Sequence, residues 1–443
     1  MLIDRLKKID SYPFHMPGHK RNTDLFRFDF TEIEATDDLH HPQGILKERM
    51  EKAAEIYGTL STKFLVNGST CGILAAVCAL TKEGDSILMA RNCHKSVYNA
   101  VLLKGLKPYY ICPKTDEKGI CGGISPKEVE KALKESGAKL FVMVSPIYEG
   151  VVSDIKAISG VCKSFGCILV VDEAHGAHFS FYDKFPTSAV KLGADVVIQS
   201  LHKTLPALTQ TGILHICSDR IDKNEVFKSL SIFESSSPSY LLLSSADSCI
   251  DFMHSPKGQR FFDYYWAMLT DFRKKARGYI LDSDVIGKNH IFDLDPSRLV
   301  IFGGKEAAEA IRRQNIELEM ENVLYSVAIS SVGDTQEGFD RLLKAFKTFE
   351  PLTEESIKGD FGIIKPKIIL SPKEAEVRDS ERIPLKASVG RICKEAVYIY
   401  PPGVPAVNKG EEITSEVLEL ISAYIERDLN VIGIENNTIS IIK

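Results

Sequence analysis

The pattern of apolar and polar positions between residues 57 and 217 predicts a parallel β-sheet with crossover helices. Short runs rich in β-branched residues alternate with small or polar loops and with amphipathic stretches of helix length. The strand candidates are "DSILMA", "KPYYIC", "KLFVMVS", "CILVVD", "DVVIQS" and "GILHI". The helix candidates are "TCGILAAVCALTKEG", "HKSVYNAVLLKG", "SPKEVEKALKESG" and "IKAISGVCKSFG", and several close with the glycine expected just past a helix C-terminus. This pattern is typical of the α/β class.

The flanking segments predict how the chain divides into domains. Residues 1–56 contain the turn-rich stretches "FHMPGHKRN" and "DDLHHPQGI", which favour an arm over a separate domain. Long helical patterns run from about 238 to 282, and a second alternating region begins after 291 with "RLVIF" and "YSVAISS". We therefore expect an N-terminal arm (1–56), a large domain (57–290) and a small C-terminal α/β domain (291–443).

Charge, cysteine spacing and apolar content indicate which partners and which cellular compartment to expect. The net charge of −5 comes from interspersed charges without a basic stripe, which argues against a nucleic-acid partner. The ten cysteines are scattered without a C-x-x-C pair, as in proteins whose thiols stay reduced. The N-terminus lacks the apolar core of a signal peptide, and no apolar run approaches the roughly 18 residues of a membrane span. We expect a cytoplasmic protein without a membrane partner.

Polar residues that can carry chemistry follow several of the predicted strands. In an open α/β sheet, ligands bind beyond the carboxyl ends of the strands. The candidates are Gly68, Ser69 and Thr70 before a helix, His94 after "SILMA", Asp172 and His175 in "DEAHGAH", and Ser200, His202 and Lys203 in "QSLHKTL". Together they offer an anion-binding turn, imidazoles, a carboxylate and an amine.

A ligand that needs all of these groups is pyridoxal 5'-phosphate (PLP). A lysine can form a Schiff base with its aldehyde, and a carboxylate can keep its pyridine nitrogen protonated. Hydroxyls and backbone N–H groups at a helix N-terminus can bind its phosphate. Each residue alone also has an ordinary structural interpretation, as a helix cap, a turn former, a buried histidine or a solvated lysine. Their joint occurrence in the order phosphate loop, imidazole, carboxylate, amine favours a PLP site, and we expect no bound metal.

Seven ordered motifs resemble those of the Orn/Lys/Arg decarboxylase family, the prokaryotic branch of fold-type I PLP enzymes. They are "FHMPGHK", "NGSTCGILAA", "RNCHKSVYNA", "VDEAHGAHF", "QSLHKTLPALTQTG", "SSSPSYLLLSSAD" and "YPPGVPAVNKGEEIT". The resemblance implies an aspartate aminotransferase-like large domain with a mainly parallel sheet and a smaller C-terminal α/β domain. It also implies a short form without the N-terminal wing domain of the larger members. One departure is Lys409, which stands where the family usually has proline.

The resemblance implies a role for each candidate residue. Lys203 is expected to form the Schiff base, Asp172 to pair with the pyridine nitrogen, and His94 to stack on the ring. His175 is expected near the phenolic oxygen of the cofactor or near the substrate. The residues expected around the phosphate are Gly68, Ser69, Thr70, Ser200 and His202.

The stretch "FESSSPSY" concerns assembly. Taken alone, its hydroxyls and lack of apolar periodicity fit a flexible linker with a helix cap as well as they fit a functional segment. In the resembling family, a matching segment reaches the phosphate of the partner's cofactor across a two-fold interface. Ser236 or Ser237 is therefore expected to serve the opposite subunit, in a homodimer or higher homo-oligomer with shared active sites.

The expected reaction is decarboxylation of lysine, ornithine or arginine to the amine and CO2, feeding polyamine synthesis, with Lys203 or His202 returning a proton to Cα. The distal cation of such a substrate needs a carboxylate, and Glu411 and the acidic segment "TEIEATDD" are candidates, although such a segment is also typical of a solvated loop. Two alternatives stay open. The first is another fold-type I reaction, by an aminotransferase or a lyase; an aminotransferase would need an arginine such as Arg382 or Arg391 to clamp the α-carboxylate. A catalytically silent regulatory paralogue would not need the intact Lys203 and Asp172.

Overall fold

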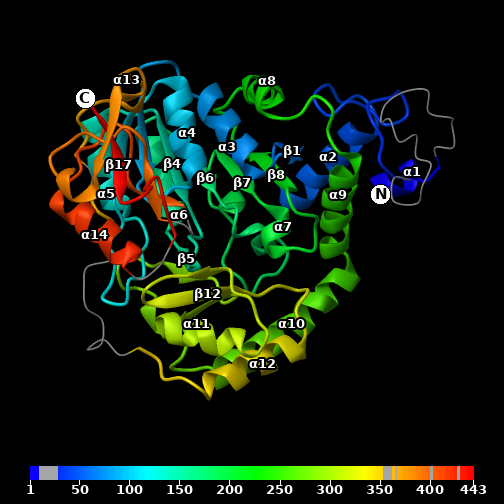
Figure 1. The fold of residues 1–443 in the computed structure, drawn as a ribbon. Coiled ribbons are helices and arrows are strands. Elements are labelled where there is room, and N and C mark those ends of the chain that lie inside the picture. Colours follow the sequence, from blue (N-terminus) through cyan, green and yellow to red (C-terminus); the bar gives the residue numbers. More distant parts are fainter. Residues whose placement is uncertain (9–27, 353–361, 366, 400–402, 427–429) are drawn as a thin grey trace. The chain divides into compact units, whose positions relative to one another are not determined.

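The computed structural model describes residues 1–8, 28–352, 362–365, 367–399, 403–426 and 430–443 (Figure 1). The motif "FHMPGHK" and the beginning of "YPPGVPAVNKGEEIT" lie outside the described residues. The chain forms two compact units that are interleaved along the sequence. The first comprises 1–80, 168–266 and 331–333, and the second comprises 81–167, 267–330 and 334–443. The domain boundaries expected from the sequence stay a prediction.

The first unit holds four of the seven strands of the central sheet, in the order β1-β8-β7-β6. β6 and β7 run parallel with Asp172 opposite Ile198, whereas β8 is antiparallel to both β7 and β1. Figure 1 shows β6, β7 and β8 side by side. The elements of this unit are α1 (Leu2–Leu6), α2 (Ile45–Tyr57), β1 (Ser61–Leu65), α3 (Gly68–Ala79), β6 (Ile168–Asp172), β7 (Val196–Gln199), α7 (Leu201–Thr204), β8 (Gly212–Ile216), α8 (Lys223–Phe233) and α9 (Tyr240–His254), and the first part of α10 (Pro256–Lys275).

Burial explains why these strands form where the sequence predicted them. Every residue of β7 and β8 is buried, and near-continuous apolar runs are typical of strands covered on both faces. Helix α3 packs closely against this part of the sheet. A Cβ atom on Gly72 would lie 2.9 Å from Leu65 Cδ1 and 3.2 Å from Ile198 Cγ2, so a larger residue here would require these side-chain ends to move. The predicted strands "CILVVD", "DVVIQS" and "GILHI" are confirmed.

Part of the expected N-terminal arm is helical, because α2 occupies Ile45–Tyr57. The carboxylate of Asp37 accepts backbone N–H groups from Gly44 at 2.8 Å and Leu46 at 3.0 Å, both at the start of this helix. These hydrogen bonds satisfy donors that have no partner within the helix, as an N-cap does. Asp37 therefore anchors the arm to α2.

The second unit holds the other three strands of the central sheet, in the order β4-β2-β3, with β2 parallel to both neighbours. Smaller groups of antiparallel strands, including the β13 and β17 pair, lie in the described C-terminal part of this unit. The helices are α4 (Lys95–Lys104), α5 (Pro126–Ser136), α6 (Ile155–Ser164), α11 (Gly304–Arg312), α12 (Gln336–Phe346), α13 (Pro372–Glu376) and α14 (Ser415–Ile425). The strands are β2 (Ser86–Ala90), β3 (Lys107–Ile111), β4 (Leu140–Val144), β5 (Val151–Val152), β9 (Asp293–Leu294), β10 (Arg298–Phe302), β11 (Met320–Glu321), β12 (Tyr325–Ile329), β13 (Ser380–Pro384), β14 (Val397–Ile399), β15 (Val404–Val407), β16 (Val431–Ile432) and β17 (Thr438–Ile442).

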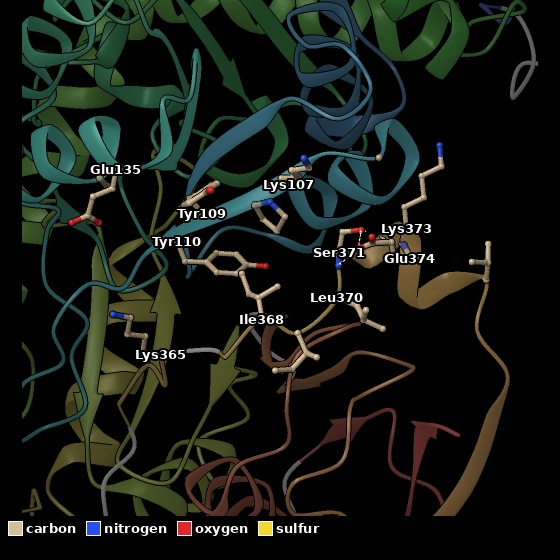
Figure 2. A pocket seen from close by; sticks show the side chains of 15 residues that line it. Lys107, Tyr109, Tyr110, Glu135, Lys365, Ile368, Leu370, Ser371, Lys373 and Glu374 are labelled. Carbon is tan, nitrogen blue, oxygen red and sulfur yellow. Dashed lines mark hydrogen bonds between the residues drawn. The ribbon is translucent and has the colours of Figure 1, made fainter.

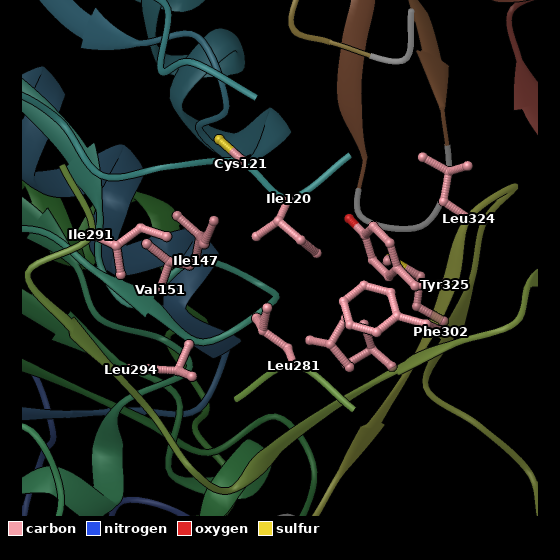
Figure 3. Packing of buried hydrophobic residues seen from close by; sticks show 13 residues of the cluster. Ile120, Cys121, Ile147, Val151, Leu281, Ile291, Leu294, Phe302, Leu324 and Tyr325 are labelled. Carbon is pink, nitrogen blue, oxygen red and sulfur yellow. The ribbon is translucent and has the colours of Figure 1, made fainter. Parts of the chain in front are cut away.

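A hydrophobic cluster in the second unit joins segments that are far apart in the sequence (Figure 3). Ile120 and Ile147 pack with Leu281, Phe302 and Tyr325, and all five are at most 7% exposed. Buried apolar area of this kind is the main source of folding free energy. The cluster therefore ties the loops after β3 and β4 to the β10-β12 sheet of this unit. Among the described helices, none combines the length and the apolar character that a membrane span requires.

Candidate active site

The predicted amine and one predicted imidazole lie in contact in the first unit. Lys203 Nζ is 3.0 Å from His175 Nε2, and both residues follow the carboxyl ends of neighbouring parallel strands. Lys203 lies in the short helix α7 after β7, whereas His175 lies in the turn after β6. A neutral imidazole nitrogen can accept a hydrogen bond from a protonated amine at this distance. The expectation that loops after separate strands bring these side chains together is thus met for Lys203 and His175.

Asp172 ends β6 and is buried, with 4% of its surface exposed. Its Oδ1 accepts a hydrogen bond from the backbone N–H of Ala174 at 3.0 Å. Burial raises the pKa of Asp172, and the charge of the nearby Lys203 acts against that rise. A buried carboxylate beside an amine is the arrangement that can hold a cationic ring nitrogen.

The predicted phosphate turn and the end of β7 also meet. Ser200 Oγ donates to Ser69 Oγ at 3.0 Å, and Ser69 lies in the first turn of α3. Gly212, at the start of β8, faces the same turn, because a Cβ atom there would lie 3.4 Å from Ser69 N. Hydroxyls and N–H groups at the N-terminus of a helix suit an anion. Gly68 leads this turn with a φ of +71°, which favours glycine.

His202 is half-buried and bonded to the main chain. Its Nδ1 donates to the carbonyl oxygen of Thr211 at 2.7 Å. Burial lowers the pKa of His202, the hydrogen bond to Thr211 acts against this change, and the charge of Lys203 adds to it. The neutral ring therefore carries its proton on Nδ1 and leaves Nε2 as an acceptor.

Ser236 and Ser237 are exposed, in the loop between α8 and α9. The loop is held at its beginning, where the carbonyl oxygen of Ser235 lies 2.9 Å from His40 Nε2. It is held at its end by Tyr240, whose hydroxyl donates to the carbonyl oxygen of Asp37. The loop therefore presents its hydroxyls to the outside of the subunit from two fixed ends.

His94 belongs to the second unit, where it is the N-cap residue of α4. Its Nδ1 lies 2.9 Å from Ser96 Oγ and accepts the backbone N–H of Ser96 at 3.3 Å. These bonds fix the ring plane, as an N-cap interaction does. The stacking role of His94 stays a prediction.

The carboxylates considered for the distal cation of the substrate are mostly engaged elsewhere. Glu411 is 2% exposed, and its two oxygens accept from the guanidinium of Arg91 at 2.6 and 2.8 Å. Its Oε2 also accepts the N–H of Asn408 at 2.7 Å. Asp37 caps α2, and Asp38 accepts the N–H of His40 at 2.8 Å. A buried, paired carboxylate is a poor partner for an incoming cation, which argues against Glu411.

Sequence reasoning missed two buried acids of the first unit. Glu173, next to Asp172, accepts three hydrogen bonds, and burial raises its pKa to about 7. Glu234 accepts the N–H of Val66 at 2.6 Å, just before the predicted phosphate turn, and burial likewise raises its pKa to about 7. The available signal was their position, since Glu173 lies within "DEAHGAH" and Glu234 within "FESSSPSY".

A pocket of about 780 Å³ lies in the second unit (Figure 2). Strand β3 contributes Tyr109 and Tyr110 to one wall, and the segment with Ile368 and Leu370 contributes the other. None of the residues selected from the sequence lines it. The proposed chemistry therefore rests on the side-chain cluster of the first unit.

Solved structures with the same fold include the lysine decarboxylase LdcF of Francisella novicida. The match covers 100% of this chain and 81% of that one, with a TM-score of 0.84 and 19% sequence identity. At this identity the likeness shows the fold. With its α/β architecture and mostly parallel seven-stranded sheet, the chain has the fold of fold-type I PLP-dependent enzymes.

Sequence comparisons assign the family. The model "Orn/Lys/Arg decarboxylase, major domain" matches residues 3–298, and "Orn/Lys/Arg decarboxylase, C-terminal domain" matches residues 361–438. The arginine decarboxylase of Bacillus subtilis (strain 168) is 34% identical over 97% of this chain and 94% of the relative. The arginine decarboxylase of Bacillus anthracis is 32% identical over 100% of this chain and 95% of the relative. The chain belongs to the Orn/Lys/Arg decarboxylase family and is a PLP-dependent amino-acid decarboxylase.

Proposed function

We propose that this enzyme decarboxylates arginine to the corresponding amine and CO2, and that the amine supplies polyamine synthesis in the cytoplasm. The choice of arginine is supported by the relatives of nearly full length that carry that name. The observation that carries the chemistry is the 3.0 Å contact between Lys203 Nζ and His175 Nε2, with the buried Asp172 on the adjoining strand. Lysine and ornithine remain the competing substrates.

The donor set of the first unit fits PLP. Lys203 would hold the aldehyde carbon, Asp172 would face the pyridine nitrogen, and the turn at Gly68, Ser69 and Ser200 would bind the phosphate. When bound, PLP supplies the electron sink that accepts the bonding pair left by the departing carboxylate. Thr70, in the first turn of α3, would add a hydroxyl to the phosphate turn.

Different side chains of the site are suited to accept and to donate protons. His175 Nε2 lies within hydrogen-bonding distance of Lys203 Nζ, so the imidazole can hold the amine in place and take its proton. His202 is poorly suited to donate, because its Nδ1 proton is bound to Thr211 O and its Nε2 is an acceptor in the neutral ring. We therefore assign the return of a proton to Cα to Lys203.

The guanidinium groups that an aminotransferase would need are already paired with other residues of the C-terminal part. Arg382 donates to Thr438 Oγ1 at 3.0 Å and lies 3.6 Å from Glu395. Arg391 lies 3.2 Å from Glu381. A substrate carboxylate would have to displace these partners to be clamped. This favours decarboxylation, because a substrate α-carboxylate without a strong ion pair is less stabilised in the ground state and leaves more easily.

The substrate assignment predicts a clear order of specificity. Purified protein with PLP is expected to release CO2 from arginine with a kcat/KM at least roughly 100-fold above that for neutral amino acids, because a neutral side chain cannot make the charge-assisted hydrogen bonds of a guanidinium. The measurement is CO2 and amine release with arginine, lysine, ornithine and a neutral panel. Preference for lysine or ornithine would overturn the choice of arginine, and keto-acid formation would overturn decarboxylation.

We propose that the active enzyme is a homodimer, or a higher oligomer built from dimers, in which Ser236 or Ser237 serves the opposite subunit's cofactor phosphate. The exposed hydroxyls between the anchored residues Ser235 and Tyr240 support this role. In a two-fold dimer, each copy would then complete the site of the other.

Subunit mixing tests this sharing of sites. Inactive Lys203→Ala protein is mixed in equal amounts with an inactive Ser236→Glu, Ser237→Glu double mutant under conditions that let subunits exchange. If sites are shared, each mixed dimer has one intact site, so activity should recover to roughly a quarter of the wild-type value for random two-fold pairing. A mixture that exchanges subunits, followed by mass labels, yet stays inactive would show that each site is built within one chain.

A further inference from the structure

The carboxylate of Glu173 is the end point of a buried hydrogen-bond network beside Asp172. Only 2% of Glu173 is exposed. Its Oε2 accepts from Ser188 Oγ at 2.6 Å and from Gln199 Nε2 at 2.6 Å, and its Oε1 accepts from the N–H of Ala189 at 2.7 Å. Three donors in one buried place satisfy a carboxylate well.

The network continues from Gln199 to His215 and Thr62, both in the first unit. His215 Nε2 lies 3.4 Å from Gln199 Oε1, and His215 Nδ1 lies 2.9 Å from Thr62 Oγ1. Complete burial lowers the pKa of His215 to about 3, so its ring is neutral. Because the Gln199 amide group donates to Glu173, its oxygen must accept from His215 Nε2, and His215 Nδ1 must then accept from Thr62.

Every donor in this chain therefore points toward Glu173. The N–H groups of Gln199 and Ala189 can only donate, so a proton on Glu173 could be accepted only by the Ser188 hydroxyl, whereas the carboxylate accepts all three donors. Burial raises the pKa of Glu173 to about 7, and the bonds from Ser188, Ala189 and Gln199 act against that rise. The direction of the hydrogen bonds favours the ionised form.

Glu173 also connects the two strand ends that carry the proposed site. Its backbone N–H donates to Ile198 O at 2.8 Å, and its side chain holds Gln199, the residue before Ser200. These two links fix the end of β6, which carries Asp172, against the end of β7, which leads to Lys203. The position of Glu173 also places its negative charge next to Asp172, and neighbouring like charges increase the proton affinity of a carboxylate.

We propose that Glu173 is a positioning residue whose negative charge strengthens the hold of Asp172 on the proton of the cofactor's pyridine nitrogen. This inference rests on the proposed role of Asp172. Asp172, Tyr57 and Cys217 interact electrostatically with Glu173, and His215 is linked to it through Gln199. The charge of Lys203 acts on Asp172 in the opposite sense, so the effect of Glu173 is measured by comparing variants in which Lys203 is unchanged.

The test follows the protonation of the cofactor itself. Wild-type protein and Glu173→Gln are loaded with PLP labelled with 15N in the ring, and the nitrogen chemical shift is recorded across a pH series. We expect the midpoint at which the ring nitrogen loses its proton to fall by about one pH unit in Glu173→Gln, as for a unit charge removed from a nearby interior position. The Kd for PLP and the melting temperature of the cofactor-free protein are measured in parallel.

Matched variants separate charge from architecture. Glu173→Asp keeps the charge and is expected to titrate close to the wild type even if it loses stability. Ser188→Ala removes one donor and should shift the midpoint in the same direction as Glu173→Gln by a smaller amount. It also provides the test if the Glu173→Gln protein does not fold. Asp247→Asn, which removes a buried charge bonded to Arg49 and Leu2, should lower stability without moving the midpoint.

The outcomes are distinct from those of the proposed function. Glu173→Gln and Ser188→Ala titrating like the wild type would overturn the role of Glu173, even if both lost stability or PLP affinity. Equal shifts in Glu173→Gln and Glu173→Asp would also overturn it, because the effect would then follow geometry. A wild-type protein that binds PLP without a protonated ring nitrogen would instead refute the role of Asp172 on which the inference rests.

Discussion

Lys203→Ala is expected to abolish turnover, lowering kcat by at least roughly four orders of magnitude, because the amine serves both to hold the cofactor and to move protons. The geometry that motivates this is the 3.0 Å contact of Lys203 Nζ with His175 Nε2 near the buried Asp172. The visible absorbance of the lysine-linked cofactor should disappear with the amine. Borohydride reduction of the native protein should fix PLP on the peptide that contains Lys203.

The matched control is Lys223→Ala, which removes an exposed lysine at the start of α8 and should retain full turnover and the label. Added methylamine should restore part of the activity of Lys203→Ala if the missing function is that of an amine. Label on another peptide, or turnover within tenfold of the wild type in Lys203→Ala, would refute the assignment.

The six strands predicted from the sequence all occur in the structure, including β3, which is only partly buried. "DVVIQS" and "GILHI" correspond to β7 and β8, because continuous apolar runs bounded by polar turns are distinctive. The strand β1, with the sequence STKFL, was missed, because Lys63 and its polar neighbours break the apolar pattern. Lys63 is nevertheless only 8% exposed, and its ammonium lies 4.8 Å from the ring centroid of Phe227. Tertiary contacts of this kind leave no trace in local periodicity.

The candidate site could be predicted in outline because its residues follow strand ends, where α/β sheets bind ligands. That rule led to Asp172, His175 and Lys203, which the structure brings near one another. It could not reveal that Glu411 is bonded to Arg91, since the two are 320 positions apart and pair only in the folded chain. The rule also did not single out Glu173. Its position beside Asp172 makes it part of the same motif, and only the folded chain shows the three hydrogen-bond donors around its carboxylate.

Asp172→Asn is expected to lower kcat by roughly two to four orders of magnitude while the protein still binds PLP. Asparagine has nearly the same size and can still accept the N–H of Ala174 through its amide oxygen, so the turn after β6 should be preserved. Without the carboxylate, the pKa of the pyridine nitrogen falls and the ring becomes a weaker electron sink. Each pKa unit corresponds to about 1.4 kcal/mol, so a fall of a few units accounts for a loss of this size.

The measurement is kcat together with the PLP dissociation constant and the melting temperature of Asp172→Asn. Asp172→Glu serves as the control, because it keeps the charge and should retain more activity than the amide despite its extra methylene group. Replacing PLP by an analogue whose ring nitrogen carries a fixed positive charge should reduce the difference between Asp172→Asn and the wild type, because protonation is then no longer required. Near-normal turnover of Asp172→Asn with PLP would show that another group keeps the ring nitrogen protonated.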